Sequence, residues 1–203
     1  HHPMVEGLIA KKLKEKYGIP FITIEHSHDD PFNGNDEYQQ NYSEVASSAD
    51  AFICPSKHVL ESILSKYSVK NPMVIYNGGA QLIEGSKKFD FNGRIKFISV
   101  GALSEYKNHR TLINAFDDPI LKEKAELEII GDGPLRREYD ELINSLKLQN
   151  VVRLSGNMPH DLVFNEMDKS HVFILISEES FSVAAVEAMS RRLPIVFLNQ
   201  LLF

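Results

Sequence analysis

Two glutamates eight positions apart, Glu179 and Glu187, are the side chains of this sequence best spaced to hold an extended polar ligand. Ser180 and Ser182 between them are good helix-capping residues, and an apolar run without a helix breaker follows as far as Met189. The first turn of a helix leaves backbone N–H groups unpaired and carries a partial positive charge, which suits a phosphate. A ligand with hydroxyls at both ends and phosphate between them fits this spacing, and a nucleotide sugar is such a ligand.

A structural role for the same glutamates competes with this interpretation. Glu187 stands one turn before Arg191, and such a pair stabilises a helix by only about 0.2–0.5 kcal/mol. Glu178 and Glu179 could be solvated loop residues. However, the neighbours of Glu187 are almost all apolar, and a carboxylate buried among them without a partner is costly. The segment alone does not decide between a salt bridge and a ligand clamp.

The alternation of short apolar runs and helical segments predicts the elements that position these glutamates. The run Val172–Ile176 is typical of a buried parallel strand, and it leads through a tight loop into the helix that carries Glu187. Repeated strand–helix units build a parallel, doubly wound sheet, in which ligands bind at the carboxyl ends of the strands. The other predicted strands cover residues 21–24, 51–54, 73–76, 95–100, 127–130, 151–154 and 195–198. The predicted helices cover residues 4–17, 37–47, 56–67, 108–116, 134–147, 160–169 and 182–191.

This alternation is interrupted once, in the weakly patterned segment 79–93, which contains glycines. Such a composition is typical of a linker between domains. We therefore expect two domains of the α/β class, residues 1–78 and residues 94–203.

Composition and charge narrow the functional classes. The chain has 203 residues, of which 43% are hydrophobic, and its net charge of −6 gives no electrostatic footprint for nucleic acid. No apolar run is long enough to span a bilayer, and the N-terminal residues do not have the pattern of a signal peptide. Cys54 is the only cysteine, so an intrachain disulfide is impossible and a small buried residue is its expected role. These features predict a cytoplasmic enzyme.

Four lysines along the predicted helix 4–17 leave two interpretations open. They are Lys11, Lys12, Lys14 and Lys16. Such a helix could bind weakly to an anionic membrane, at the cytoplasmic face. The acidic residues Glu6 and Glu15 interrupt the basic stretch, which favours an ordinary solvated helix face.

A second polar cluster follows the predicted strand 21–24. His26 and His28 are two residues apart, so an extended backbone would place both imidazoles on one face, and Asp29 and Asp30 come next. Such side chains could hold the metal of a hydrolase. No second cluster of metal ligands follows in the sequence, which favours a polar loop, and we expect no bound metal.

Several segments at predicted strand ends together resemble the family-4, or group 1, glycosyltransferases. VGALSEYK at 100–107 and LINAF at 112–116 are similar to the family's VGRLxxxKG…LIxAF segment. IGDGP at 130–134 and VRLSG at 152–156 look like its GxGP…VxFxG stretch, and residues 179–187 match its E-x7-E motif. The first half is similar in outline, with YGIPFIT at 17–23, FICPS at 52–56 and VIYNG at 74–78. Each motif is short, but their order and spacing are specific, and the resemblance covers nearly the whole chain.

This resemblance implies the GT-B fold, in which two Rossmann-like parallel-sheet domains face each other across a cleft. The second domain holds a nucleotide-diphosphate sugar, and the first, acceptor-side domain would be represented here only by its C-terminal part. The family transfers the sugar with retention of configuration and generally needs no bound metal or other cofactor. The acceptor would be a glycan, a lipid-linked intermediate or a small molecule. Complete members are nearly twice as long, so the resemblance also implies a chain truncated at both ends.

The same resemblance assigns roles in donor binding. Glu179 would contact hydroxyls of the donor sugar, and Glu187 would hold the ribose hydroxyls of the nucleotide. Lys107 would neutralise the diphosphate, aided by backbone N–H groups around Ser182 and Val183.

Other positions follow from the same comparison. Asn157 and Met158 would lie near the base. His26 matches the histidine that follows the corresponding strand of the family, near the transferred sugar, so His26 and Glu179 are the catalytic candidates. Further candidates around the donor are Gly101, Arg110, Gly131 and Asp132.

Three positions depart from the family's pattern. Ala102 stands where arginine is usual, which would weaken diphosphate binding by roughly ten- to a hundredfold unless Arg110 compensates. Ser182 replaces a glycine at the diphosphate-binding turn, where its Cβ could crowd the phosphate. Arg192 replaces a glycine where the last helix must turn sharply into a strand.

Two other functions are compatible with the same fold. One is epimerisation of a nucleotide sugar. The other is a module that binds a nucleotide sugar without catalysis, which the alanine at 102 and the serine at 182 suggest.

Overall fold

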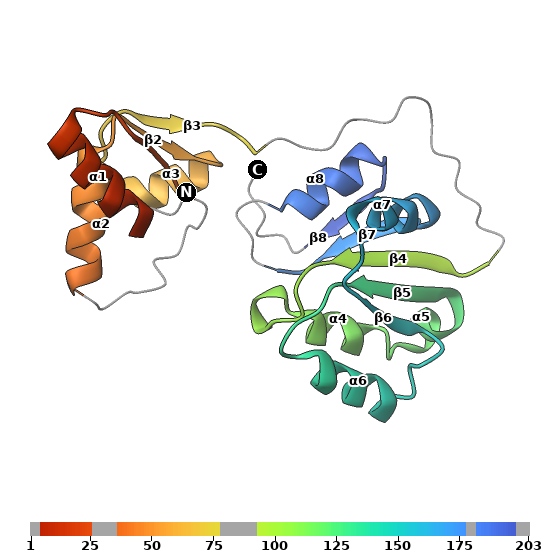
Figure 1. Ribbon diagram of the computed structural model, residues 1–203. Helices are drawn as coiled ribbons and strands as arrows, with labels where there is room; N and C mark the ends of the chain where they lie inside the picture. The colour runs from red at the N-terminus through yellow and green to blue at the C-terminus, as the bar shows by residue number, and fades with distance from the viewer. Residues whose placement is uncertain (1–4, 26–35, 78–92, 178–181, 198–203) are drawn as a thin grey trace. The chain divides into compact units, whose positions relative to one another are not determined.

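The computed structural model of the chain describes residues 5–25, 36–77, 93–177 and 182–197 (Figure 1). These residues form helices and parallel strands in two compact units, His1–Gly78 and Gly79–Leu201. Each unit has its own parallel sheet, so the predicted α/β class is confirmed.

The first unit contains a three-stranded sheet with strand order β1-β2-β3. Its strands are β1 (Ile22–Ile24), β2 (Ala51–Cys54) and β3 (Pro72–Val74), and its helices are α1 (Val5–Tyr17), α2 (Asp36–Ser48) and α3 (Lys57–Leu64). The middle strand β2 buries Phe52 and Cys54 completely, against aromatic side chains of α2, so the expected burial of the cysteine is confirmed. The Ser56 hydroxyl begins α3 by accepting a hydrogen bond of 3.2 Å from the Val59 N–H.

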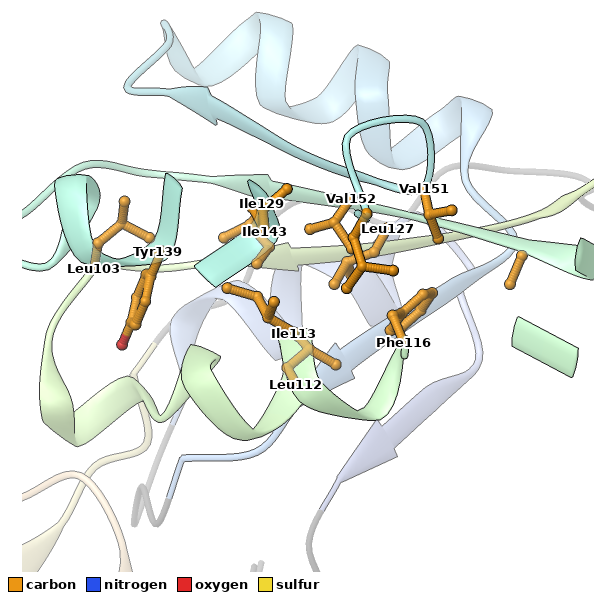
Figure 2. Packing of buried hydrophobic residues seen from close by; sticks show 12 residues of the cluster. Leu103, Leu112, Ile113, Phe116, Leu127, Ile129, Tyr139, Ile143, Val151 and Val152 are labelled. Atoms are coloured by element: carbon orange, nitrogen blue, oxygen red, sulfur yellow. The ribbon is translucent and has the colours of Figure 1, made fainter. Parts of the chain in front are cut away.

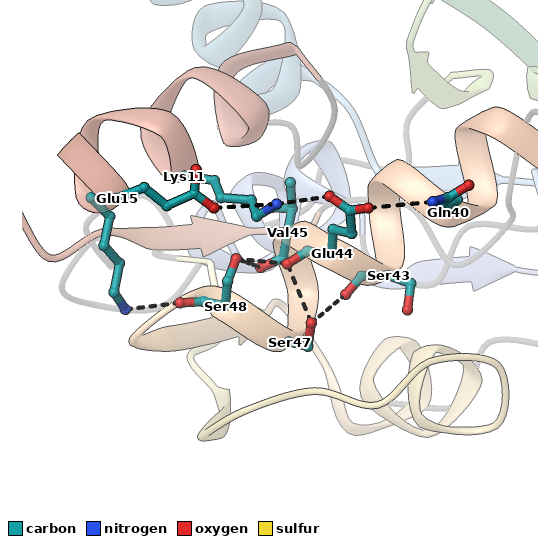
Figure 3. Close-up of polar contacts among 9 residues, drawn as sticks. Lys11, Glu15, Gln40, Ser43, Glu44, Val45, Ser47 and Ser48 are labelled. Carbon is teal, nitrogen blue, oxygen red and sulfur yellow. Dashed lines mark hydrogen bonds and ion pairs between the residues drawn. The ribbon is translucent and has the colours of Figure 1, made fainter.

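Ion pairs join α1 to α2 and to the turn that follows α2, and Figure 3 shows the pair between Lys11 and Glu44. The Nζ of Lys11 lies 2.7 Å from Glu44 Oε2, and the Nζ of Lys14 lies 2.6 Å from Asp50 Oδ1. The contact with Lys11 lowers the pKa of the Glu44 carboxyl. Two of the four lysines of α1 are therefore engaged within the protein, which favours the interpretation of this helix as an ordinary polar surface.

The second unit contains a five-stranded sheet with strand order β6-β5-β4-β7-β8. Its strands are β4 (Ile95–Val100), β5 (Ala125–Ile130), β6 (Val152–Gly156), β7 (Val172–Leu175) and β8 (Ile195–Phe197). Its helices are η1 (Glu105–Lys107), α4 (His109–Ala115), α5 (Pro119–Lys124), α6 (Arg136–Ser145), α7 (His160–Lys169) and α8 (Val183–Ser190). The chain starts at the central strand β4, moves outward to β6 and then crosses back to β7 on the other side of β4. This is the strand order of a Rossmann-like, doubly wound sheet.

Helices cover both faces of this sheet (Figure 1). On one face α4 and α6 pack on β5 and β6, and Ile113 and Tyr139 are completely buried there (Figure 2). On the other face α7 and α8 pack over β4 and β7, and Met167, Phe173 and Ala188 are completely buried. Burying a large apolar side chain stabilises the folded state by about 1.5–3 kcal/mol. These contacts therefore hold α8 and the segment after β4 in place on the hydrophobic core.

The short helices η1 and α5 are the elements that the sequence pattern does not predict. Helix α5 is the longer of the two. Its six residues are too few to show helical periodicity. A local signal is nevertheless present, because Asp118 precedes Pro119 at the first helical position. The Asp118 carboxylate accepts hydrogen bonds from the N–H groups of Ile120 at 2.8 Å and Leu121 at 3.3 Å.

Candidate functional site

The carboxyl ends of β4 and β7 mark the point of the second sheet where the chain diverges. The two strands are neighbours, and the register that pairs Ile98 with Phe173 places their last residues, Val100 and Leu175, at the same level. The chain continues from β4 to one side of the sheet and from β7 to the other. Ligands of doubly wound sheets bind at such a switch point. The segment after β4 and the start of α8 therefore form the candidate site.

Lys107 lies in the segment after β4, at the end of η1. A Cβ at Gly101 would lie 3.3 Å from the Cδ and Cε atoms of Lys107, so the glycine lets the lysine's aliphatic chain lie along the backbone. The Lys107 Nζ lies 5.8 Å from the centre of the Tyr106 ring. Asn108 then directs the chain into α4 with a φ of 52°, a left-handed conformation that asparagine adopts more readily than most residues.

The segment after β5 supports the segment that carries Lys107. The Leu103 N–H donates a hydrogen bond of 3.1 Å to the carbonyl oxygen of Asp132. A Cβ at Gly131 would lie 2.0 Å from the carbonyl oxygen of Gly101, and the φ of 140° at this position also favours glycine. The three secondary candidates Gly101, Gly131 and Asp132 therefore shape the backbone around the lysine.

Arg110 forms an ion pair with Glu138 of α6. Its guanidinium is therefore held by the helix that covers one face of the sheet. The prediction that Arg110 replaces the arginine missing at position 102 gains no support from this arrangement. Ala102 itself is exposed in the segment between β4 and η1.

Ser182 is the N-cap of α8 and is 8% exposed. Its φ of −111° and ψ of 112° lie in the extended region that all residues adopt, so the backbone here does not require a glycine. Its hydroxyl accepts a long hydrogen bond of 3.4 Å from the Ala185 N–H. Val183, the first helical residue, is 46% exposed. The first N–H groups of an α-helix have no acceptor within the helix itself, and a helix N-terminus of this kind suits an anion.

Glu187 lies in the second turn of α8, with 14% of its side chain exposed. Its Oε1 lies 2.8 Å from the Nε2 of His160, the first residue of α7. The side chain of His160 is 61% exposed, and its ring centre lies 4.4 Å from that of Phe164, one turn further along α7. Sequence patterns do not identify His160, because 27 positions separate it from Glu187 and the contact depends on how α7 and α8 pack.

The alternative prediction, a salt bridge between Glu187 and Arg191, is wrong. Arg191 pairs instead with Asp168 of α7, whose Oδ1 lies 2.8 Å from the Arg191 Nε. The hydrogen bond to Asp168 raises the pKa of the Arg191 guanidinium. Glu187 therefore serves neither as the helix partner of Arg191 nor as an unpartnered buried carboxylate.

Asn157 and Met158 connect β6 to α7, directly before Pro159 and His160. Asn157 is exposed, whereas Met158 packs against the core beneath α7 and α8. The loop predicted to lie near a base and the carboxylate predicted to hold a ribose therefore meet at His160.

Two candidates, His26 and Glu179, lie outside the described residues, and their roles stay predictions. The same applies to His28, Asp29 and Asp30. Among the residues that are described, no group of three or more histidine, cysteine, aspartate or glutamate side chains is arranged to hold a metal ion. Within this same part of the chain, no helix has the length and apolar character needed to cross a membrane.

Glu25, which directly follows β1, is a buried polar residue that sequence patterns do not identify. It is 2% exposed, and its Oε2 accepts a hydrogen bond of 2.7 Å from the Tyr42 hydroxyl. Burial, and to a smaller extent the nearby Glu25, raises the pKa of Tyr42 far above its usual range. The same two causes raise the pKa of the Cys54 thiol to about 12. The carboxyl end of the first sheet thus holds a compact buried polar cluster.

A cavity of about 270 Å³ lies at the amino-terminal ends of β4, β5 and β6, away from the candidate site. Its lining includes charged residues of both signs. The Nζ of Lys96 lies 3.3 Å from Glu126 Oε1, and the Ser155 hydroxyl donates a hydrogen bond to Glu128. Because these charged side chains already have polar partners, we assign this cavity no ligand.

Comparison with known proteins places the chain among glycosyltransferases. The profile of the family described as "Glycosyl transferases group 1" matches residues 84–201, and that of "Glycosyltransferase Family 4" matches residues 1–78. The uncharacterized glycosyltransferase MJ1059 of Methanocaldococcus jannaschii is 36% identical over 107 residues, which are 52% of this chain and 26% of that protein.

A second relative is the N-acetylgalactosamine-N,N'-diacetylbacillosaminyl-diphospho-undecaprenol 4-alpha-N-acetylgalactosaminyltransferase of Campylobacter jejuni. It is 34% identical over 149 residues, which are 70% of this chain and 39% of that protein. The chain therefore spans only about a quarter to two fifths of the length of these two relatives.

Solved structures show the same fold. Anabaena Alr3699/HepE in complex with UDP and glucose has a TM-score of 0.79 at 18% identity, over 96% of this chain and 57% of that one. The pneumococcal O-GlcNAc transferase GtfA in complex with UDP and GlcNAc has a TM-score of 0.72 at 18% identity, over 97% of this chain and 40% of that one.

Proposed function

The chain belongs to the family of group 1 glycosyl transferases, with their GT-B fold, and we propose on this premise that it is part of a retaining glycosyltransferase. The proposed reaction transfers a sugar from a nucleotide-diphosphate sugar to a glycan, lipid-linked or small-molecule acceptor. The observation that carries the proposal is the switch point of the second sheet. There the segment with Lys107 follows one strand, and helix α8 follows the neighbouring parallel strand. Helix α8 also carries the largely buried Glu187.

The diphosphate of the donor would bind between Lys107 and the first turn of α8. A helix N-terminus contributes about 0.3–1 kcal/mol toward an anion, which is too little to hold a multiply charged group by itself. A hydrogen bond to a charged group adds about 1.5–3 kcal/mol. Lys107 is therefore proposed as the main diphosphate ligand, with the N–H groups around Ser182 and Val183 as the second contribution.

The nucleoside would bind beside the diphosphate, toward α7. Glu187 would accept hydrogen bonds from the ribose hydroxyls, and Asn157 and Met158 would lie near the base. The solved relatives HepE and GtfA hold UDP, which supports a nucleoside diphosphate as ligand and makes uridine the first base to test.

In the proposed transfer, a hydroxyl oxygen of the acceptor bonds to the sugar's anomeric carbon as the bond between that carbon and the diphosphate breaks. Negative charge develops on the leaving diphosphate, which takes up the proton of the acceptor hydroxyl. Lys107 and the α8 N-terminus would stabilise that charge where it forms. Glu179 would contact the sugar hydroxyls, and His26 would lie near the transferred sugar. Because fixed positive groups supply this stabilisation, we propose that the reaction needs no metal.

We also propose a cytoplasmic location. The single cysteine, which is buried and without a disulfide partner in the chain, suits a reducing compartment. Any attraction of α1 to an anionic membrane face would be weak, because Lys11 and Lys14 are engaged in ion pairs.

Calorimetry of the 203-residue chain with UDP, GDP and ADP tests the proposal. We expect one of the three to bind, and we expect Lys107→Ala and Glu187→Ala each to weaken that binding by about tenfold or more. Lys124→Ala, which changes an exposed lysine at the end of α5, is the matched control and should bind like the unchanged chain. A folded chain that binds none of the three nucleotides would refute the proposed function.

A further inference from the structure

His160 and Glu187 join the two segments that flank the proposed nucleoside site. His160 follows the loop with Asn157 and Met158, and Glu187 lies on the helix that begins at the proposed diphosphate site. The Nε2 of His160 lies 2.8 Å from Glu187 Oε1. The glutamate side chain is 14% exposed and the histidine 61%, so the imidazole lies on the solvent side of the pair.

Packing against Phe164 holds the imidazole in this position. The ring of Phe164 lies 4.4 Å from that of His160, centre to centre. The guanidinium carbon of Arg191 lies 5.2 Å from the centre of the same Phe164 ring, and Arg191 pairs with Asp168. Arg191 is thereby kept from Glu187, although it is only one turn away on α8. The Phe164 ring packs against His160, and the ion pair with Asp168 engages Arg191. His160 is therefore the side chain that orients Glu187.

The pair leaves the glutamate able to bind a ligand. A carboxylate has about four acceptor positions on its two oxygens, and His160 uses one of them at Oε1. The histidine acts as the donor when its Nε2 carries the proton. A glutamate side chain loses conformational entropy when it is held in one rotamer. If His160 already holds Glu187 before the ligand binds, this entropy loss no longer reduces the free energy of binding.

We propose that His160 is a positioning residue for the nucleotide ribose. It holds Glu187 in the orientation in which the carboxylate accepts hydrogen bonds from both ribose hydroxyls, and it does not itself contact the ribose. This inference rests on the proposed nucleotide-sugar function and deepens it. The site then selects nucleoside diphosphates with an intact ribose diol over their deoxy counterparts.

The test compares two ligands and several variants of the whole chain by calorimetry. The ligands are whichever of UDP, GDP and ADP binds best and the 2′,3′-dideoxy form of the same nucleotide. His160→Ala should weaken binding of the ribonucleotide by about three- to tenfold and leave binding of the dideoxy form unchanged. His160→Gln, whose amide N–H₂ can replace the Nε2 donor, should restore most of the affinity.

Glu187→Ala provides the matched background. In that variant the two ligands should bind with similar affinity, and adding His160→Ala should have no further effect, because the histidine acts through the glutamate. Circular dichroism of each variant checks that the fold is kept.

An equal loss for both ligands in His160→Ala would overturn the proposal, because it would show contact with the base or a general distortion. An unchanged ribonucleotide affinity would overturn it as well. Both results leave the proposed function standing. If the unchanged chain binds no nucleotide, the proposed function fails and this inference fails with it.

Discussion

Lys107 supplies the side-chain positive charge that the described residues bring to the proposed diphosphate site. Arg110 is paired with Glu138, and position 102 is an alanine. Ala102 is exposed in the same short segment that Gly101 and Gly131 hold against the sheet. A longer, charged side chain at position 102 therefore has room to reach a bound anion.

Ala102→Arg should strengthen nucleoside diphosphate binding by about tenfold, because a hydrogen bond to a charged group is worth about 1.5–3 kcal/mol. Calorimetry with UDP measures the change. Ala102→Gln has a long polar side chain without charge, and it should bind like the unchanged chain. If the arginine and glutamine variants bind equally, the anion does not lie within reach of position 102.

Cys54 makes the stability of the first unit sensitive to alkaline pH. Its pKa is raised from 9.0 to about 12 by burial and by Glu25, so the unfolded chain loses the thiol proton at a lower pH than the folded protein. The unfolded state then binds fewer protons, and the free energy of unfolding falls as pH rises from about 9 toward 12. The contribution is fully present below pH 9 and is lost through that window.

Urea denaturation under reducing conditions at about pH 8 and about pH 10 measures this loss. We expect Cys54 to account for about 1.4 kcal/mol of the decrease in the free energy of unfolding between the two values. Cys54→Ala removes the thiol and should show a decrease that is smaller by this amount. The remaining slope includes Tyr42, whose pKa is also raised. Equal slopes for the two proteins would show that the folded environment does not disfavour the thiolate.

Helix α8 is proposed to bind the diphosphate at its N-terminus, and the chain turns sharply after its C-terminus. Arg192 has a φ of 61° there, and its N–H donates to the Met189 carbonyl oxygen at 2.9 Å. The N–H of the buried Leu193 donates to the Ala188 carbonyl oxygen at 3.0 Å. These two bonds form a Schellman motif, in which glycine is the usual residue at the left-handed position. The expected sharp turn at Arg192 is thus present, and an arginine occupies it.

Arg192→Gly should be more stable than Arg192→Ala by about 1 kcal/mol. A residue with a Cβ costs about 1–2 kcal/mol in the left-handed conformation, and part of the gain is offset by the greater freedom of glycine in the unfolded chain. Comparing glycine with alanine removes the contacts of the arginine side chain from the difference. The free energy of unfolding in urea measures it. An alanine variant as stable as the glycine variant would mean that the turn changes its conformation to relieve the strain.

The order and type of most elements can be predicted from the sequence, because buried parallel strands are short apolar runs between helical segments. Helix α5 is too short for such a pattern, although Asp118 and Pro119 mark its start locally. The site is predictable only where its residues lie close together in the chain. The contact of His160 with Glu187 and the pairing of Arg110 with Glu138 depend on how separate helices pack, which no local pattern contains.

For the molecule as a whole, two family profiles match the two units separately, residues 1–78 and 84–201. The proposed contacts to the nucleotide come from the second unit. The alternative cluster of His26, His28, Asp29 and Asp30 belongs to the first. One experiment on the whole chain can therefore test whether nucleotide binding by the second unit depends on a metal ion.

Removing divalent cations should leave nucleoside diphosphate binding unchanged. The charge of the diphosphate is offset by Lys107 and by the N-terminus of α8, which are fixed parts of the protein and require no bound ion. Calorimetry with UDP in the presence of EDTA, and again after Mn²⁺ is restored, should give affinities that agree within about twofold. A loss of tenfold or more that Mn²⁺ reverses would contradict the metal-free proposal. If His26→Ala together with His28→Ala then abolished the effect of Mn²⁺, the metal would belong to the histidine cluster of the first unit.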